Sequence, residues 1–388
     1  MQTKLVVNQV GIVGAGAMGS GIAQIASQSG CSVVLFDLKQ EALDISEGKL
    51  NKLMARLVEK GRISEEESKD IRARIHRTIK ISDLKDCELL VEAVVENLEI
   101  KHVVFKQIES VVSETAIIAS NTSSLSITAI AAGCDSPERV VGLHFFNPAP
   151  LMPLVEIIPA VQTRADLPSK LVELMLSWGK TPVIAKDTPG FIVNRVARPF
   201  YGEALRILDE GIADVLYIDE AMRRAGFRMG PFQLTDLIGH DVNYAVTESV
   251  FKAFYYDPRY MPSITQLKLV EAGWLGRKTG RGFYNYNEPI SEVRIENDLQ
   301  TLISQRIIAM LINEAADAVY YGIASASDVD TAMTKGVNYP KGLLVWAEEL
   351  GLEKVVLLID SLRDAYGETR YRCSPLLRKL AKEGGSFH

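Results

Sequence analysis

The feature that most constrains the fold is a glycine motif that lies between a strand pattern and a helix pattern. Gly14-Ala15-Gly16-Ala17-Met18-Gly19 directly follows the apolar run of residues 10–13 and opens a segment rich in alanine. In this context Gly14 permits a tight turn, Gly16 lets the backbone approach a pyrophosphate, and Gly19 lets helix and strand pack closely. The N–H groups at the start of such a helix face the phosphates, so we expect Gly14, Gly16, Ala17, Met18 and Gly19 to bind a dinucleotide.

The same alternation of short apolar runs and helical patterns continues to residue 187. The strand-like runs cover residues 10–13, 32–36, 88–91 and 116–119. A right-handed series of this kind gives a Rossmann-like, doubly wound α/β sheet whose ligands bind beyond the carboxyl ends of its strands. We therefore predict a dinucleotide-binding domain over residues 1–187 and expect its functional residues to follow strands.

An acidic residue ends the second strand pattern. Asp37 lies 18 residues beyond Gly19. Its carboxylate can accept hydrogen bonds from both ribose hydroxyls, and its charge repels the extra phosphate of NADP. The pattern favours NAD over NADP, although Lys39 close by leaves NADP open. FAD would fit the same glycine motif, and the reacting groups described below decide against it.

The pattern changes to long helices after Asp187-Thr188-Pro189-Gly190, where Thr188 is predicted to cap the first helix and Pro189 to begin it. This helical part contains a repeat. Five features recur 111 residues later: Arg195, Glu203-Ala204, Gly211, Asp219 and Met222 match Arg306, Glu314-Ala315, Gly322, Asp330 and Met333. Gly230 and Gly239 match Gly342 and Gly351 at a spacing of 112. We predict two tandem all-α domains, 188–287 and 288–388, with the junction at Asn287-Glu288-Pro289.

The composition narrows the class of function. A formal net charge of −6 argues against general nucleic-acid binding, and no apolar run approaches the roughly 18 residues of a membrane helix. The four cysteines have no spacing typical of a metal site, so no metal is expected and the thiols should be reduced. The first ten residues show no secretory or transit pattern, which predicts a cytoplasmic location.

Three polar segments beside strand patterns carry the candidate reacting groups. They are Ser120-Asn121-Thr122-Ser123-Ser124, His144-Phe145-Phe146-Asn147-Pro148, and Glu156 within residues 154–158. A secondary alcohol can pass a hydride to nicotinamide only if a base takes its hydroxyl proton. His144 is the candidate base. Glu156 could hold one ring nitrogen, orient the other toward substrate and favour the protonated imidazole.

A structural role is the alternative for these residues. His144 could be a core histidine and Glu156 a salt-bridged strand end. We favour the base because His144 ends a strand on the side where ligands bind, whereas His76, His102 and His240 stand in helical, polar surroundings. Thr122-Ser123-Ser124 also fits a cap for a helix over residues 125–132, and capping is compatible with substrate contact.

Four segments together resemble the 3-hydroxyacyl-CoA dehydrogenase family. They are Gly14 to Gly19, Ser120 to Leu125, His144 to Pro148, and Asp187-Thr188-Pro189-Gly190-Phe191-Ile192-Val193-Asn194-Arg195. The resemblance covers residues ~9–287, and the repeat resembles the doubled C-terminal domain of longer family members. It implies NAD-dependent oxidation of 3-hydroxyacyl-CoA thioesters, with short chains such as 3-hydroxybutyryl-CoA expected.

The resemblance also implies roles for individual residues. The family's catalytic histidine falls on His144 and its acidic partner on Glu156, while Ser123 and Asn194 fall where the substrate's 3-oxygen binds. The remaining implied positions belong to the NAD site, in a cleft between domains: Glu96, Lys101, Ser123, Asn147 and Lys278. From the residues alone, Glu96 and Lys101 would be an ordinary helix-start acid and a solvated lysine.

A stripe of cations lies along the helix predicted after the second strand. Lys49, Lys52, Arg56 and Lys60 are spaced three, four and four residues apart, so they share one helical face. A flexible row of cations could hold the pyrophosphate and 3′-phosphate of coenzyme A. A solvated surface explains each residue equally well, so the prediction concerns the stripe and no single lysine.

The second helical copy differs from the first in its polar residues. Gln305 stands at the position equivalent to Asn194, and Lys278-Thr279-Gly280 has no counterpart. We hypothesise that the second copy covers apolar surface of the first. The protein would then be a monomer in which this copy replaces a dimer partner; the alternative is a homo-oligomer.

Two other functions remain open from the sequence. The first is a dehydrogenase of free hydroxy acids or sugar acids with the same architecture. The second is a non-catalytic structural or nucleotide-sensing protein, because a fold alone does not carry function. The set Ser123, His144, Glu156 and Asn194 favours an enzyme.

Overall fold

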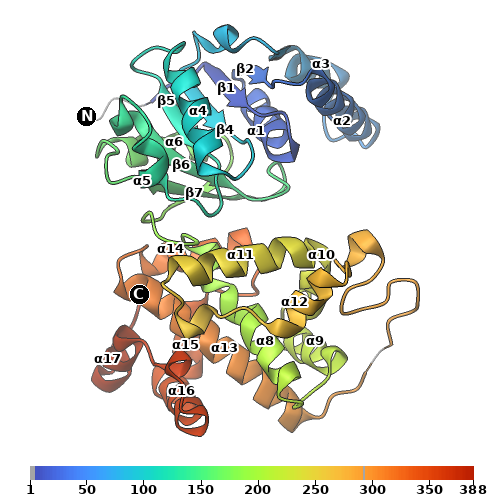
Figure 1. Ribbon diagram of the computed structural model, residues 1–388, viewed down its shortest axis with the longest axis vertical. Coiled ribbons are helices and arrows are strands. Elements are labelled where there is room, and N and C mark those ends of the chain that lie inside the picture. Colours follow the sequence, from blue (N-terminus) through green and yellow to red (C-terminus); the bar gives the residue numbers. More distant parts are fainter. Residues whose placement is uncertain (1–4, 292) are drawn as a thin grey trace. The chain divides into compact units, whose positions relative to one another are not determined.

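The computed structural model describes residues 5–291 and 293–388. The chain divides into two compact units, Met1–Thr188 and Pro189–His388. Within the described residues, the first unit is built around one sheet and the second consists of helices and short 3₁₀ turns (Figure 1). The α/β class predicted from the glycine motif is confirmed. No helix in the described part of the chain is long and apolar enough to cross a membrane.

The first unit contains an eight-stranded sheet with the order β3-β2-β1-β4-β5-β6-β7-β8. All neighbouring strands pair in parallel except β6 and β7. The strands are β1 Gln9–Val13, β2 Ser32–Phe36, β3 Ile75–Thr78, β4 Leu89–Glu92, β5 Ile117–Ser120, β6 Val140–Phe145, β7 Leu154–Pro159 and β8 Thr181–Ile184. The carboxyl ends of β1, β4, β5 and β6 therefore meet at one sheet edge, and the amino end of β7 reaches the same edge.

Helices cover both faces of this sheet. They are α1 Ala17–Gln28, α2 Gln40–Glu59, α3 Glu65–Ala73, α4 Leu98–Glu109, α5 Ile127–Ala131 and α6 Leu167–Ser177, with 3₁₀ turns η1 Ile81–Leu84 and η2 Pro137–Arg139. Apolar residues of α1, α2, α3 and α6 share one core with alternate residues of the strands. A Cβ on Gly142 of β6 would meet Ile127 of α5, so α5 covers the other face.

Because side chains alternate along a strand, register decides which ones share a face. Glu92 pairs with Ser120, Ser120 with Gly142, and His144 with Glu156. All of them point to the α5 face, at the edge where the parallel strands end. The sheet thus gathers these polar side chains although they are far apart in the sequence.

Local details differ from the sequence expectations at three places. Ser126, and not the segment 122–124, caps α5, and Asp187 also accepts hydrogen bonds from the backbone N–H groups of Ile127 and Thr128. Thr188 starts no helix, because the next helix begins only at Val193. The surroundings expected for His76 are also wrong, because it lies on β3, whereas His240 begins α11 as expected and is buried there.

The second unit consists of two helical segments with matching order. The first has α7 Val193–Val196, α8 Arg198–Asp209, α9 Val215–Arg224, α10 Pro231–Ile238, α11 His240–Ala253, η3 Pro258–Tyr260, α12 Ile264–Glu271 and η4 Arg277–Thr279. The second has α13 Asn297–Tyr320, α14 Ala326–Gly336, α15 Leu343–Leu350, α16 Leu352–Tyr366, η5 Thr369–Tyr371 and α17 Pro375–Glu383.

One long helix, α13, corresponds to α7 plus α8. Pro199 explains the break, because it lacks the N–H that a continuous helix would need, and its counterpart is Met310.

Buried ion pairs join the two segments reciprocally. Arg195 Nε lies 2.5 Å from Glu314 Oε1, and Arg306 Nε lies 2.9 Å from Glu203 Oε2. Each pair combines an arginine of one segment with the repeat-equivalent glutamate of the other. All four side chains are buried. The repeat seen in the sequence therefore corresponds to a local two-fold arrangement of contacts.

The same equivalence extends to helix capping. Asp219 accepts hydrogen bonds from the N–H groups of Phe232 and Gln233 at the start of α10. Asp330 does the same for Leu344 and Val345 at the start of α15. These contacts support the division into two copies, whose boundaries stay a prediction.

Candidate functional site

The glycine turn joins β1 to α1. Gly14 has φ = 106°, which favours glycine, and its N–H donates to Phe36 O at 2.8 Å. A Cβ on Gly19 would lie 1.8 Å from Gly14 O, so only glycine lets α1 start this close to the turn. A Cβ on Gly16 would meet nothing within 4 Å. The backbone at Gly16 is thus open to a ligand, as the motif predicts.

Asp37 is fixed beside this turn. Its Oδ2 accepts from Ala15 N at 2.8 Å and its Oδ1 from Lys39 N at 2.9 Å. A cavity of about 520 Å³ opens at the same place. It is lined mainly by the glycine turn, the end of β2 and α4: Gly14, Gly16, Asp37, Leu38, Ile100 and Val104. An apolar cavity with one carboxylate at its rim suits the adenosine half of a dinucleotide.

His144 and Glu156 form a buried pair at the sheet edge. Nδ1 of His144 lies 2.7 Å from Oε2 of Glu156, and the exposed fractions are 6% and 0%. Their strands run antiparallel and the two residues are directly opposite in register. The ring of Phe146 lies 4.4 Å from the imidazole, centroid to centroid. The arrangement fixes the ring and places a carboxylate behind it, as a histidine base requires.

Glu96 organises the segment after β5. One of its oxygens, Oε1, accepts from Thr122 Oγ1 at 2.7 Å, from Ser123 N at 2.9 Å and from Ser124 N at 3.1 Å. Burial alone would raise the pKa of Glu96, but these hydrogen bonds and the charge of Lys101 outweigh it and lower that pKa. Glu96 therefore stays ionised and holds the backbone of Ser123 in place.

Lys101 is buried between two carboxylates. Its Nζ lies 2.6 Å from Glu92 Oε1 and 3.4 Å from Glu96 Oε2. Ser120 Oγ also donates to Glu92 at 2.7 Å. Glu92 is absent from the residues expected from the sequence, because the predicted strand ends at Val91 and β4 extends one residue further. An acid that closes a strand pattern of this domain, as Asp37 does, was the available signal.

Asn147 lies near the glycine turn. It lines a groove of about 420 Å³ together with Gly16, Ala17, Pro148 and Lys49. The groove links the pyrophosphate turn to the start of the cationic stripe. Of the stripe, only Lys49 lines it; the whole stripe, Lys49, Lys52, Arg56 and Lys60, is exposed along α2 and its C-cap.

Two of the expected site residues belong to the second unit. Asn194 lies in α7 and is partly buried. Lys278 lies in η4, where its Nζ is 2.6 Å from both carboxylate oxygens of Asp241. The first unit brings together Gly14, Asp37, Glu96, Lys101, Ser123, His144, Asn147 and Glu156 on one sheet edge and its adjoining turns.

Comparison with known proteins identifies both units. The family described as "3-hydroxyacyl-CoA dehydrogenase, NAD binding domain" matches residues 9–188. The family described as "3-hydroxyacyl-CoA dehydrogenase, C-terminal domain" matches residues 190–286 and 302–386. Together these matches cover both units, and the prediction of NAD as cofactor is confirmed.

Individual relatives agree with this. The chain is 38% identical to 3-hydroxyadipyl-CoA dehydrogenase of Escherichia coli K12, over 97% of this chain and 98% of that protein. It is 44% identical to a probable 3-hydroxybutyryl-CoA dehydrogenase of Deinococcus radiodurans, over 71% and 99%. A crystal structure of 3-hydroxybutyryl-CoA dehydrogenase from Escherichia coli K12 superposes with a TM-score of 0.94 at 38% identity, covering 98% of this chain and 99% of that one. The chain belongs to the 3-hydroxyacyl-CoA dehydrogenase family.

Proposed function

We propose that the protein oxidises short-chain (S)-3-hydroxyacyl-CoA thioesters to 3-ketoacyl-CoA, reversibly and with NAD. The observation that carries the proposal is the buried His144–Glu156 pair at the sheet edge that also holds the glycine turn. The relatives' names add two candidate substrates, 3-hydroxybutyryl-CoA and 3-hydroxyadipyl-CoA. Both carry a secondary alcohol at C3, which this pair is suited to deprotonate.

The residues divide the chemistry among them. Glu156 holds Nδ1 of His144, so Nε2 is the ring nitrogen that takes the proton of the C3 hydroxyl. Bound NAD would accept the hydride from C3, so the C–H and O–H bonds break as the ketone forms. The carboxylate of Glu156 stabilises the imidazolium that results and, in the reverse direction, the same imidazolium returns the proton.

Other residues position the reactants in this proposal. Ser123, whose backbone Glu96 holds, and Asn194 bind the 3-oxygen. Asn147 lies beside the nicotinamide, and Glu96, Lys101 and Lys278 complete the NAD site. The cationic stripe on α2 holds the phosphates of coenzyme A, with Lys49 nearest the groove that leads to the glycine turn.

A substrate panel tests the proposal. The full chain is assayed for NADH formation with 3-hydroxybutyryl-CoA and with free 3-hydroxybutyrate, and for NADH oxidation with acetoacetyl-CoA. We expect turnover of both thioesters and at least a hundredfold lower kcat/KM for the free acid, because the acid lacks the coenzyme A handle. Turnover of free hydroxy acids or sugar acids alone would show a free-acid dehydrogenase. Binding of NADH without turnover of any substrate would show a nucleotide-sensing protein.

The second helical copy is proposed to cover the first, which would make the protein a monomer. The reciprocal pairs Arg195–Glu314 and Arg306–Glu203 support this, because each copy completes buried charges of the other. Sedimentation of the full chain measures the oligomeric state. A cytoplasmic location, expected from the sequence, is tested by fractionation of cells.

A further inference from the structure

One difference between the two helical copies lies on α8, at a position whose counterpart in α13 is buried. In the second copy this position is Asn313, whose Nδ2 donates to Arg372 O at 2.9 Å and whose Oδ1 accepts from Ser374 N at 2.7 Å. In the first copy the equivalent residue is Gly202. In the first copy the residue at this position therefore leaves the space of the Asn313 side chain unfilled, and the end of the Arg206 side chain lies 3.4 Å from where a Cβ of Gly202 would stand.

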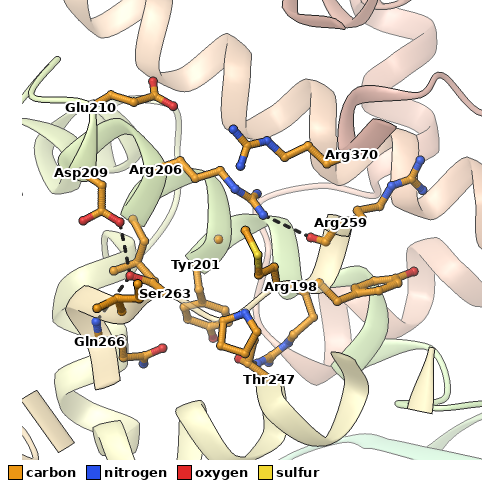
Figure 2. Close-up of a pocket in the computed structure, with 16 residues that line it drawn as sticks. Arg198, Tyr201, Arg206, Asp209, Glu210, Thr247, Arg259, Ser263, Gln266 and Arg370 are labelled. Carbon is orange, nitrogen blue, oxygen red and sulfur yellow. Dashed lines mark hydrogen bonds between the residues drawn. The ribbon is translucent and has the colours of Figure 1, made fainter. Parts of the chain in front are cut away.

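A cavity of about 340 Å³ lies at this place in the first copy (Figure 2). The turns η3 and η5 correspond at a spacing of 111 residues, so Met261 and Ser263 are the equivalents of Arg372 and Ser374, and both line the cavity. Its other walls combine apolar and hydroxyl groups, among them Tyr201, Leu205, Ile264 and Thr247. A cavity of this size and mixed lining suits a short carbon chain with a polar end.

Arg198 supplies a charge at one end of the cavity. Its side chain is only 7% exposed, Nη1 donates to Thr247 Oγ1 at 3.0 Å, and Nε has no hydrogen-bond partner. No carboxylate of the described residues pairs with it. Burial lowers the pKa of Arg198, but a guanidinium remains charged at neutral pH. The equivalent residue in the second copy is Ala309, so this charge belongs to the first copy alone.

The other charged residues that line the cavity are already paired. Arg206 bonds Glu203, Arg259 bonds Glu314, and Arg370 lies 2.9 Å from Glu368. The two acids are engaged as well, since Asp209 accepts from Thr265 and Glu210 from Arg306. Arg198 is thus a buried cation without a compensating anion. Such a group is costly unless a ligand supplies the missing charge.

We propose that Arg198 binds a carboxylate at the far end of the acyl chain, so that the protein prefers 3-hydroxyacyl thioesters of a dicarboxylic acid. This inference rests on the proposed function, in which Asn194 binds the 3-oxygen. Arg198 follows Asn194 by four residues, one turn along nearly continuous helix, a rise of roughly 6 Å. In a six-carbon diacid the terminal carboxylate is separated from C3 by three carbon–carbon bonds, within reach of a flexible arginine.

The test compares two substrates that differ mainly in this carboxylate. The kcat/KM values of the full chain are measured for 3-hydroxyadipyl-CoA and 3-hydroxyhexanoyl-CoA. Arg198→Met removes the charge at similar volume, Arg198→Lys keeps it, and Gly202→Asn places the second copy's residue in the cavity. A Cβ on Gly202 would come no closer than 3.4 Å to Arg206 Nη1, so this variant should fold. Arg223→Met, at an exposed pair with Glu220, is the matched control.

We expect the wild type to prefer 3-hydroxyadipyl-CoA. Arg198→Met should lower kcat/KM for that substrate about 10- to 100-fold and change the value for 3-hydroxyhexanoyl-CoA less than about threefold, because a charge-assisted bond is lost only in the first case. Arg198→Lys should recover part of the loss, and Gly202→Asn should lower the preference with Arg198 intact. Arg223→Met should change neither value.

Equal losses on both substrates, or an unchanged preference in Arg198→Met and Gly202→Asn, would overturn the inference while leaving the dehydrogenase proposal standing. Absence of turnover with every thioester in the wild type would instead overturn the proposed function. Binding of free adipate tests whether the carboxylate that Arg198 binds belongs to a free dicarboxylate instead of an acyl chain. If free adipate binds the wild type in an Arg198-dependent way but 3-hydroxyadipyl-CoA is not preferred, the cavity holds a free dicarboxylate and the acyl-chain assignment is wrong.

Discussion

The two units bury charge for different purposes. In the sheet unit the buried titratable groups, among them Lys101, Glu92, His144 and Glu156, form pairs at or next to the ends of strands. In the helical unit the buried pairs Arg195–Glu314 and Arg306–Glu203 link two copies of one repeat. The contrast suggests that a change at a buried pair should cost activity in the first unit and stability in the second.

The largest expected effect is on turnover, from His144→Gln. Glutamine keeps a donor for Glu156 but cannot take the hydroxyl proton, so kcat should fall roughly 10²- to 10⁴-fold. The melting temperature and the affinity for NADH, measured by fluorescence, should change little. His76→Gln, at an exposed site on β3, is the control and should keep full activity.

A loss of thermal stability comparable to the loss of activity in His144→Gln would break the comparison. It would show that the pair with Glu156 holds the sheet together. Unchanged kcat would remove His144 from the chemistry altogether.

The next effect is on stability, from Glu314→Gln. Arg195 would lose its charge partner while staying buried, which should cost roughly 3–5 kcal/mol of unfolding free energy. Urea denaturation measures this loss. Glu349→Gln, at an exposed pair with Lys341, should cost less than about 1 kcal/mol. Both variants should keep wild-type kcat at temperatures where they are folded.

The same substitution should also change how the stability of the protein depends on pH. Burial would raise the pKa of Glu314, but the charges of Arg195 and Arg259 outweigh it and lower that pKa. The resulting stability is present above the ordinary glutamate pKa and is lost as pH falls through the lowered value. The wild type should therefore lose more stability than Glu314→Gln on acidification below about pH 4.3. Parallel acid profiles would contradict the pairing.

The smallest expected effect concerns the cofactor site of the sheet unit. Asp37→Asn keeps an acceptor for Ala15 N but removes the charge at the cofactor cavity. The KM for NAD should rise roughly 10- to 100-fold, since a charge-assisted bond is lost, and discrimination against NADP should weaken. Asp44→Asn on the exposed face of α2 is the control. A variant as strict for NAD as the wild type would show that Asp37 does not select the cofactor.

Much of the sheet unit could be predicted because its signals are local. The glycine motif and the acid after β2 specify their own turn, and His144 stands at the end of its strand pattern. The part that Asp187 plays in capping α5 could not be predicted, because this residue reaches the helix from 60 residues further along the chain. Glu92 was missed because a strand boundary was placed one residue early.

In the helical unit the residues could be predicted from the sequence, but their contacts could not. Its repeat was visible in the sequence, and so were the arginines and glutamates that carry the reciprocal pairs. Which of them pair across copies depends on packing, and the pattern does not give it. Arg198 was missed for a related reason: its lack of a carboxylate partner depends on which side chains pack around it.

The antiparallel pairing of β6 and β7 has a consequence for the loops around the site. Both members of the His144–Glu156 pair are held by strand backbone, and neither depends on a connecting segment for its position. Insertions or deletions in the turns that shape the substrate pocket can therefore change what is bound while the proton-handling pair keeps its geometry. A scaffold of this kind can acquire new acyl chains without rebuilding its chemistry.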